Sequence, residues 1–215
     1  AFIDDPYLFG RIAATHALGD IYAMGATPIT ALATVTVPYG VPGKVEEDLF
    51  QVLRGGLDVL EAEGCALIGG HSAEGAELAL GFTINGAVDS DKILRKSGMC
   101  PGDKLILTKP LGTGTLFAAD MRGKARAQWI AQALTSMQRS NRRASEILRA
   151  HGATAATDVT GFGLAGHLYE MMLASQVDVR VDLAALPVLD GAMEALAAGI
   201  ESSLAPENRL IQRVM

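Results

Sequence analysis

Three short segments of this chain place carboxylate or imidazole side chains beside small residues. Asp20 stands in an otherwise apolar stretch, His71 follows Gly69-Gly70, and Asp158 precedes a glycine-rich turn. Carboxylate oxygens are ligands that Mg²⁺ prefers, and exposed N–H groups of glycine-rich turns bind anions. These residue types therefore predict a site for a divalent cation together with phosphate groups.

The segment around Asp20 is predicted to be one helix over residues 6–24. Asp5 suits the N-cap and Gly25 suits the position past the end. Most of this helix is apolar, so we expect Asp20 to have little solvated surface. A buried carboxylate is costly unless donors or a cation such as Mg²⁺ satisfy it. The alternative is an ion pair with Arg11 or a cap on another segment.

The second segment, Gly69-Gly70-His71-Ser72, is predicted to be a turn after a short strand over residues 65–68. Two glycines let a ligand or a neighbouring backbone approach closely. The exposed N–H groups of such a turn could bind phosphate, and His71 could donate to a phosphate or a ribose. The alternative is a hairpin-like turn that carries a surface histidine.

The third segment is Thr157-Asp158-Val159-Thr160-Gly161-Phe162-Gly163, after a predicted strand over residues 153–157. Ligand-binding groups of α/β proteins lie at such strand ends. Asp158 could hold a metal ion while the N–H groups of the next helix face an anion. The alternative is that Asp158 is the N-cap of that helix, a role that Thr160 could fill equally well.

The same region matches the G-x-G-x-x-G pattern of dinucleotide-binding proteins through Gly161, Gly163 and Gly166. Asp182 lies about 20 residues further on, as that fingerprint requires. The preceding stretch over residues 153–157 is weakly hydrophobic for a central parallel strand, which disfavours this interpretation.

Composition limits the classes of function. The 215 residues are 49% hydrophobic and 20% charged, as in ordinary globular proteins. A net charge of −6 argues against a nucleic-acid partner. No apolar run reaches the roughly 18 residues of a membrane span, so no membrane partner is expected. Two well-separated cysteines, Cys65 and Cys100, fit reduced thiols in a cytoplasmic protein.

Hydrophobic periodicity predicts an α+β protein of two domains, 1–97 and 98–215, divided in the turn-rich stretch 89–103. Predicted strands cover 28–38, 65–68, 77–88, 104–108, 153–157 and 177–181. Predicted helices, besides the first, cover 44–63, 115–121, 124–137, 139–151, 164–175 and 189–198. Gly55 and Gly56 interrupt the second helix, where we expect another backbone to pack closely.

Four segments together resemble one family. DDPYLFGRIAATHALGDIYAMGA, LIGGHSAEG, ILTKPLGTG and TDVTGFGLAGHL look like selenophosphate synthetases, also called selenide, water dikinases. These enzymes belong to the aminoimidazole ribonucleotide synthetase-like ATP-binding superfamily. The resemblance implies that family's two-domain fold, with an N-terminal domain that forms a β-barrel-like interface in a homodimer and a mixed α/β C-terminal domain, incomplete here.

The resemblance also implies site residues and a reaction. Asp20 would bind Mg²⁺ against the ATP phosphates, and Gly69, Gly70 and His71 would contact ATP across the dimer interface. Asp158 would be a Mg²⁺ ligand in the second domain. The family converts ATP, selenide and water into selenophosphate, AMP and phosphate.

Two small departures and one large one qualify the resemblance. Gly19 stands where many relatives have serine, and His16 where many have asparagine. The family also carries a glycine-rich segment with a catalytic cysteine or selenocysteine and a lysine. Neither Cys65 nor Cys100 matches that catalytic cysteine. We therefore expect the catalytic residues to lie upstream of Ala1, with none among these 215 residues and no turnover by this chain alone.

Three other functions are weighed against this one. A thiamine-monophosphate kinase of the same superfamily should have aspartate where His71 stands and should lack TDVTGFG. A non-catalytic nucleotide-binding module would have lost the upstream cysteine and lysine. A dinucleotide-binding oxidoreductase would bind NAD and be indifferent to Asp20.

Overall fold

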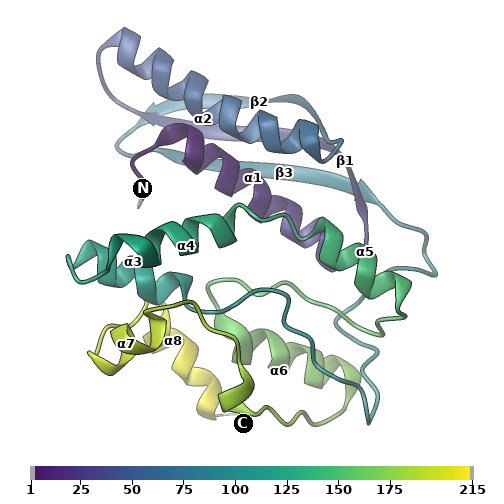
Figure 1. Cartoon of the computed structure of the whole chain (residues 1–215). Coiled ribbons are helices and arrows are strands. Elements are labelled where there is room, and N and C mark those ends of the chain that lie inside the picture. The colour runs from purple at the N-terminus through teal and green to yellow at the C-terminus, as the bar shows by residue number, and fades with distance from the viewer. Residues whose placement is uncertain (1–2, 214–215) are drawn as a thin grey trace. The chain divides into compact units, whose positions relative to one another are not determined.

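The computed structural model of the chain describes residues 3–213 (Figure 1). In chain order its elements are α1 (Pro6–Ala23), β1 (Thr27–Pro38), α2 (Pro42–Ala62), β2 (Ala66–Gly75), β3 (Ala79–Ala87), α3 (Thr113–Met121), α4 (Ala127–Met137), α5 (Arg142–Ala150), α6 (Gly163–Ser175), η1 (Leu183–Ala185), α7 (Ala192–Ala197), α8 (Ala205–Asn208) and η2 (Arg209–Arg213). The mixture of helices with one small sheet confirms the predicted α+β class.

These elements form two compact units. The first unit ends at Ile93 but also takes in Met137–Arg149, and the second comprises Leu94–Ser136 and the chain from Ala150 onward. The segment that returns to the first unit contains most of α5. We keep 1–97 and 98–215 as the proposed domain limits. The segment 137–149 lies within the second of these ranges but packs with the first unit.

Helix α1 begins and ends where its capping residues predict. The Asp5 carboxylate accepts a hydrogen bond from the Leu8 N–H at 3.0 Å, and Pro6 takes the first helical position. Gly25, directly past the C-cap, has a φ of +69°, which glycine adopts without strain. The local sequence therefore accounts for both ends of the helix.

The first unit contains a three-stranded sheet in the order β2-β1-β3. The central strand β1 pairs in parallel with β2 and antiparallel with β3. Its residues alternate between buried and more exposed positions, and Ala31, Ala33, Val35 and Val37 are buried. This period of two gives the sheet one inner face and one outer face.

Helices α1 and α2 cover the inner face of the sheet (Figure 1). The core between these layers consists of buried residues from both helices, from β1 and from the start of β2: Ala14, Leu18, Tyr22, Ala31, Val59, Leu60 and Cys65. Phe82 and Ile84 of β3 pack against it. Burial of this apolar surface is the main term that stabilises the layered arrangement.

Where the two helices cross, a glycine of each lies directly against the backbone of the other. A Cβ added at Gly55 of α2 would lie 2.0 Å from the Tyr7 carbonyl oxygen. A Cβ added at Gly10 of α1 would lie 2.0 Å from the Val52 carbonyl oxygen. The expectation that another backbone packs against Gly55 and Gly56 is confirmed at Gly55, while at Gly56 the close neighbour is the Phe82 ring.

Helix α5 is tied to the first unit by polar contacts. The Ser145 hydroxyl donates to the Tyr22 carbonyl oxygen at 2.7 Å, beneath the end of α1. The Tyr22 phenol donates to a Glu63 oxygen at 2.5 Å, and Arg142 lies 3.8 Å from the same carboxylate. Burial, reinforced by the Glu63 carboxylate, raises the pKa of the Tyr22 phenol well above its ordinary value.

The second unit packs helices against loops. Ala118 and Ala119 of α3 lie in a small core with Ala195 and Ile200. The loop before α3 runs beside residues 187–189, where the N–H of Leu111 and the N–H of Leu189 each donate to the other segment at 2.9 Å. These contacts hold the α3 and α7 regions together.

Three predicted strands of this unit are wrong. Residues 104–108, 153–157 and 177–181 are not strands in the described part of the chain. A β-prone segment becomes a strand only when another strand pairs with it. The pairings found here are isolated, such as the bond from the Ala156 N–H to the Arg95 carbonyl oxygen, and Ile106 is 69% exposed.

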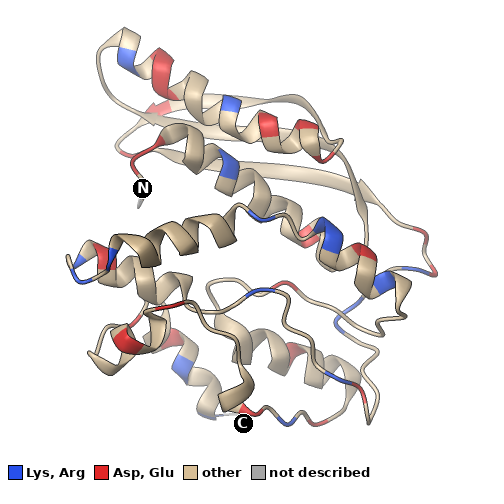
Figure 2. Ribbon diagram, viewed as in Figure 1, with Lys and Arg blue, Asp and Glu red and all other residues tan. Residues whose placement is uncertain are grey.

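Charged side chains are concentrated on helices and loops (Figure 2). Strands β1 and β3 carry no Lys, Arg, Asp or Glu, and β2 carries Glu74 alone. The outer face of the sheet is consequently almost uncharged. Within residues 3–213, no helix combines the length and apolarity needed to cross a bilayer.

The helix crossing predicts a destabilising substitution. We expect Gly55→Ala to lower the free energy of unfolding by about 1–3 kcal/mol, because its methyl group would force the two backbones apart. The matched control is Gly43→Ala, also in α2, where nothing lies within 4 Å of an added Cβ. Urea unfolding followed by far-ultraviolet circular dichroism measures both variants. Equal midpoints for the two would show that the crossing is not tightly constrained.

Candidate functional site

Asp20 lies in the last turn of α1, and its exposure contradicts the expectation of a buried carboxylate. The buried stripe of the helix follows Ala14, Leu18 and Tyr22, and Asp20 lies outside it. Asp20 and His16, one turn earlier, are both exposed. Folding therefore does not require a cation at Asp20, and its carboxylate is accessible to an ion or ligand from solvent.

The segment Gly69-Gly70-His71-Ser72 lies within strand β2, so both the predicted turn and its hairpin-like alternative are wrong. Gly70 pairs with Ala33 of β1, and a Cβ added at Gly70 would lie 2.0 Å from the Ala33 carbonyl oxygen. Glycine is needed here for the close approach of the two strands. The sequence pattern correctly indicated close backbone contact but assigned it to a turn.

His71 projects from the outer face of the sheet. It pairs with Thr34, whose neighbours Ala33 and Val35 point into the core, and both His71 and Thr34 are exposed. Strand β2 lies at an edge of the described sheet, where one row of backbone N–H and C=O groups lacks a strand partner. This part of β2 therefore offers the outward-facing backbone groups of alternate residues and an accessible imidazole at His71.

Asp158 is half-buried and precedes helix α6 without capping it. The N-cap position belongs to Phe162, which makes no side-chain capping bond, so neither Asp158 nor Thr160 is the N-cap. The Asp158 carboxylate is thus not used by the helix start. Beside it, the Thr157 hydroxyl oxygen is buried and has no hydrogen-bond partner among the described residues.

The dinucleotide interpretation lacks its structural context. No strand precedes Gly161 in the described residues, although that fingerprint requires one. Asp182 accepts a hydrogen bond from the Ala184 N–H at 3.0 Å and caps the short helix η1. The carboxylate is therefore engaged in a local turn.

The catalytic residues were expected upstream of Ala1, and Ala1 itself lies outside the described residues. The structure of residues 3–213 does not bear on that expectation, which stays a prediction. The positions considered for the site are therefore those expected to bind ATP and metal.

The candidate residues divide between the two units. Asp20, Gly69, Gly70 and His71 belong to the first unit, and Asp158 belongs to the second. Among residues 3–213, no three His, Cys, Asp or Glu side chains form a group that could hold a metal ion by themselves. A protein-only metal cage, as in structural zinc sites, is therefore not present in the described residues.

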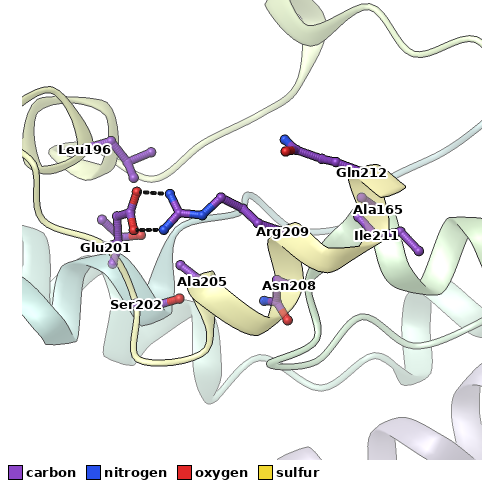
Figure 3. Close-up of a pocket in the computed structure, with 10 residues that line it drawn as sticks. Ala165, Leu196, Glu201, Ser202, Ala205, Asn208, Arg209, Ile211 and Gln212 are labelled. Atoms are coloured by element: carbon purple, nitrogen blue, oxygen red, sulfur yellow. Dashed lines mark hydrogen bonds and ion pairs between the residues drawn. The ribbon is translucent and has the colours of Figure 1, made fainter. Parts of the chain in front are cut away.

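A hollow of about 600 Å³ in the second unit contains none of the candidate residues. Its walls come largely from α8 and η2 (Figure 3). Arg209 donates to both oxygens of Glu201 at 2.6 and 2.7 Å, and Figure 3 shows this pair at the hollow. Because these two charges satisfy each other, we place the candidate site at the motif residues.

Two residues near Asp158 escaped the sequence analysis. His167 of α6 and Asn208 of α8 each hydrogen-bond the backbone of the turn that follows Asp158. His167 lies seven residues from its partner Thr160, and Asn208 lies 47 residues from its partner Gly161. No sequence motif predicts these hydrogen bonds.

Family models match most of the chain. The model of the AIR synthase related protein, N-terminal domain, matches residues 1–88, and that of the C-terminal domain matches residues 100–205. The chain therefore belongs to the AIR synthase related proteins, as the sequence motifs predicted.

Among curated proteins, the chain is similar to selenide, water dikinases. The chain is 42% identical over 211 residues to a selenide, water dikinase of Nitratidesulfovibrio vulgaris (strain DP4) and 43% identical over 206 residues to that of Trichlorobacter lovleyi. Each match covers 96% of this chain and 59% of the relative. The chain thus spans about three fifths of the length of these relatives.

Solved structures share the fold at lower identity. Thiamine-monophosphate kinase from Stenotrophomonas maltophilia K279a superposes with a TM-score of 0.75 at 24% identity, covering 94% of this chain and 62% of that one. Hydrogenase maturation protein HypE in complex with ATP gives 0.71 at 19% identity, covering 90% and 58%. These likenesses establish the architecture.

Because Asp20 is exposed, its substitution can show whether it binds a ligand or stabilises the fold. We expect Asp20→Asn to change the free energy of unfolding by at most about 1 kcal/mol, the upper range for an exposed charge. We expect Mg²⁺-dependent ATP binding to weaken at least about tenfold, which corresponds to about 1.4 kcal/mol. Thermal unfolding and titration calorimetry measure the two effects.

Asp58→Asn is the control for Asp20→Asn. Asp58 accepts from the Tyr7 hydroxyl at 2.7 Å and lies 2.6 Å from Arg54, so its loss should affect stability and leave ATP binding unchanged. If Asp20→Asn instead lost stability and bound ATP normally, Asp20 would be a structural residue.

Proposed function

We propose that the protein containing this chain is a selenide, water dikinase, which converts ATP, selenide and water into selenophosphate, AMP and phosphate. The observation that carries the proposal is 42–43% identity to curated selenide, water dikinases over 96% of the chain. Because the chain spans about 59% of those relatives, the activity is proposed for the whole protein.

The residues present fit Mg²⁺ as the accompanying ion. Asp20 is exposed, and Asp158 is half-buried and free of a helix-capping role. Mg²⁺ usually takes only one or two carboxylates and completes its shell with water and substrate phosphates. We propose Asp20 as a Mg²⁺ ligand of the first unit and Asp158 as a Mg²⁺ ligand of the second; bound Mg²⁺ would neutralise charge on phosphate oxygens.

The edge strand β2 is the proposed nucleotide contact of the first unit. Gly69 and Gly70 leave the backbone uncovered by side chains, and His71 can donate a hydrogen bond to a phosphate or ribose oxygen. Orientation of ATP by fixed backbone donors would serve phosphoryl transfer, where positioning supplies much of the catalysis. The reaction breaks two phosphoanhydride bonds of ATP and forms a P–Se bond to selenide and a P–O bond to water, so that selenophosphate, phosphate and AMP are released.

The outer face of the sheet is the proposed homodimer interface. Leu32 is 41% exposed in the centre of this face and Ile68 is 62% exposed beside it. The face is nearly uncharged, and an apolar uncharged surface is typical of interface cores. We propose that two copies pair here in a β-barrel-like arrangement that covers the exposed sheet.

The cellular location is also part of the proposal. Cys65 and Cys100 are both free thiols, the first buried and the second exposed. Free thiols fit a reducing compartment, and we propose the cytoplasm.

The activity is tested on the complete protein with ATP, Mg²⁺ and selenide under anaerobic conditions. We expect phosphorus NMR to show a selenophosphate resonance together with AMP and phosphate. ATP consumed without a phosphorus–selenium product would favour a sister ATP-dependent enzyme such as a thiamine-monophosphate kinase. ATP bound but unchanged would favour a non-catalytic nucleotide-binding module.

The dimer is tested by placing a charge on the outer face of the sheet. We expect Leu32→Glu to raise the dimer dissociation constant at least about tenfold, because like charges would meet in a desolvated interface. Phe50→Glu is the matched control, since Phe50 is 58% exposed on α2. Sedimentation velocity measures association. A wild-type protein that is monomeric, or equal effects of the two variants, would refute this interface.

A further inference from the structure

The turn that follows Asp158 is unusually well fixed. The Thr160 carbonyl oxygen accepts a hydrogen bond from the Gly163 N–H at 3.0 Å, and Gly163 has a φ of +77°, which favours glycine. The Leu204 side chain also packs against the turn, since a Cβ added at Gly161 would lie 2.8 Å from one of its methyl carbons. The backbone that carries Asp158 thus enters a turn with little freedom.

Side chains from two different helices bind this turn. His167 Nε2, on α6, lies 3.2 Å from the Thr160 N–H nitrogen and 3.1 Å from the Thr160 hydroxyl oxygen. Asn208 Nδ2, on α8, donates to the Gly161 carbonyl oxygen at 2.8 Å. The N–H of Thr160 is therefore held by an acceptor, and the C=O of the next residue, Gly161, is held by a donor.

The bond to Thr160 determines the chemical state of the His167 ring. A backbone N–H can only donate, so Nε2 must present its lone pair, and the neutral ring then carries its proton on Nδ1. The Thr160 hydroxyl oxygen lies 3.1 Å from the same nitrogen, so any hydrogen bond from it shares that one lone pair. The ring is 7% exposed, and among the described residues Nδ1 has no hydrogen-bond partner.

This arrangement leaves a buried donor unsatisfied, which costs stability. Leucine would fill the same space without that cost, but it could not bind the Thr160 N–H. The ring also meets the Phe162 side chain edge-on, with centroids 6.2 Å apart, so it is packed from within the turn it binds. What the imidazole adds is therefore fixation of the backbone two residues from Asp158.

From this geometry we propose that His167 is a positioning residue. Through its Nε2 bond to Thr160 it holds the turn in the conformation that presents the Asp158 carboxylate to a Mg²⁺ ion. The proposal rests on the proposed function of Asp158 and assigns no contact between His167 and the ligand.

The first measurement needs no variant. A long-range ¹H–¹⁵N correlation spectrum of the complete protein separates the two ring nitrogens of each histidine. We expect Nε2 of His167 to be unprotonated and Nδ1 protonated in the absence of any ligand. His167→Gln assigns the signal by its disappearance. A ring protonated at Nε2 would overturn the proposal, because it could not accept from Thr160.

The second measurement compares His167→Leu, which removes the acceptor, with His167→Gln, whose amide oxygen can reach the same place. We expect the leucine variant to need about tenfold more Mg²⁺ for half-maximal ATP binding, the scale of losses when the partner of a metal ligand is removed. We expect the glutamine variant to remain within about threefold of wild type. His151→Gln, at an exposed histidine of the same unit, is the control.

Each outcome is decisive. Equal weakening in the leucine and glutamine variants, or wild-type Mg²⁺ dependence in the leucine variant, would show that His167 has a merely structural role. Loss of thermal stability alone, without a change in Mg²⁺ dependence, would show the same. If wild-type protein bound no Mg²⁺-ATP, the proposed function would fail together with this inference, whereas the variant results overturn the inference alone.

Discussion

The close crossing of α1 and α2 is the constraint on which the first unit depends. Two helices can lie side by side on a sheet of only three strands when their backbones nearly touch, and glycine at positions 10 and 55 permits that contact. The crossing brings Leu18 and Leu60 into one core over β1. It also fixes which face of α1 turns outward, and thereby leaves Asp20 accessible.

Sequence reasoning succeeded where a signal is local. The N-cap at Asp5, the glycine after α1 and the alternation of β1 depend on neighbouring residues, and each element formed as predicted. It failed where the outcome depends on distant partners. Residues 104–108 have the composition of a strand but no strand to pair with in the described chain, and Gly69-Gly70 continue a strand because β1 lies alongside.

The candidate site shows the same division. Residue types singled out Asp20, His71 and Asp158, but the apolar composition of α1 wrongly suggested a buried carboxylate, because composition does not say which stripe of a helix faces the core. The contacts of His167 and Asn208 with the turn after Asp158 could not be foreseen. Asn208 lies 47 residues from Gly161 and reaches it only when α8 packs beside the turn. His167 lies seven residues from Thr160, but which way its ring turns is decided by the packing of α6.

The packing of α5 with the first unit limits how the gene for this chain can recombine. The backbone passes from one unit to the other at residues 93/94, 136/137 and 149/150, so neither unit is a single stretch of gene. A genetic exchange of residues 1–93 alone would leave behind Ser145, whose hydroxyl satisfies the Tyr22 carbonyl, and Arg142, which faces Glu63. We therefore expect residues 1–93 and 137–149 to be inherited together and to change together during evolution.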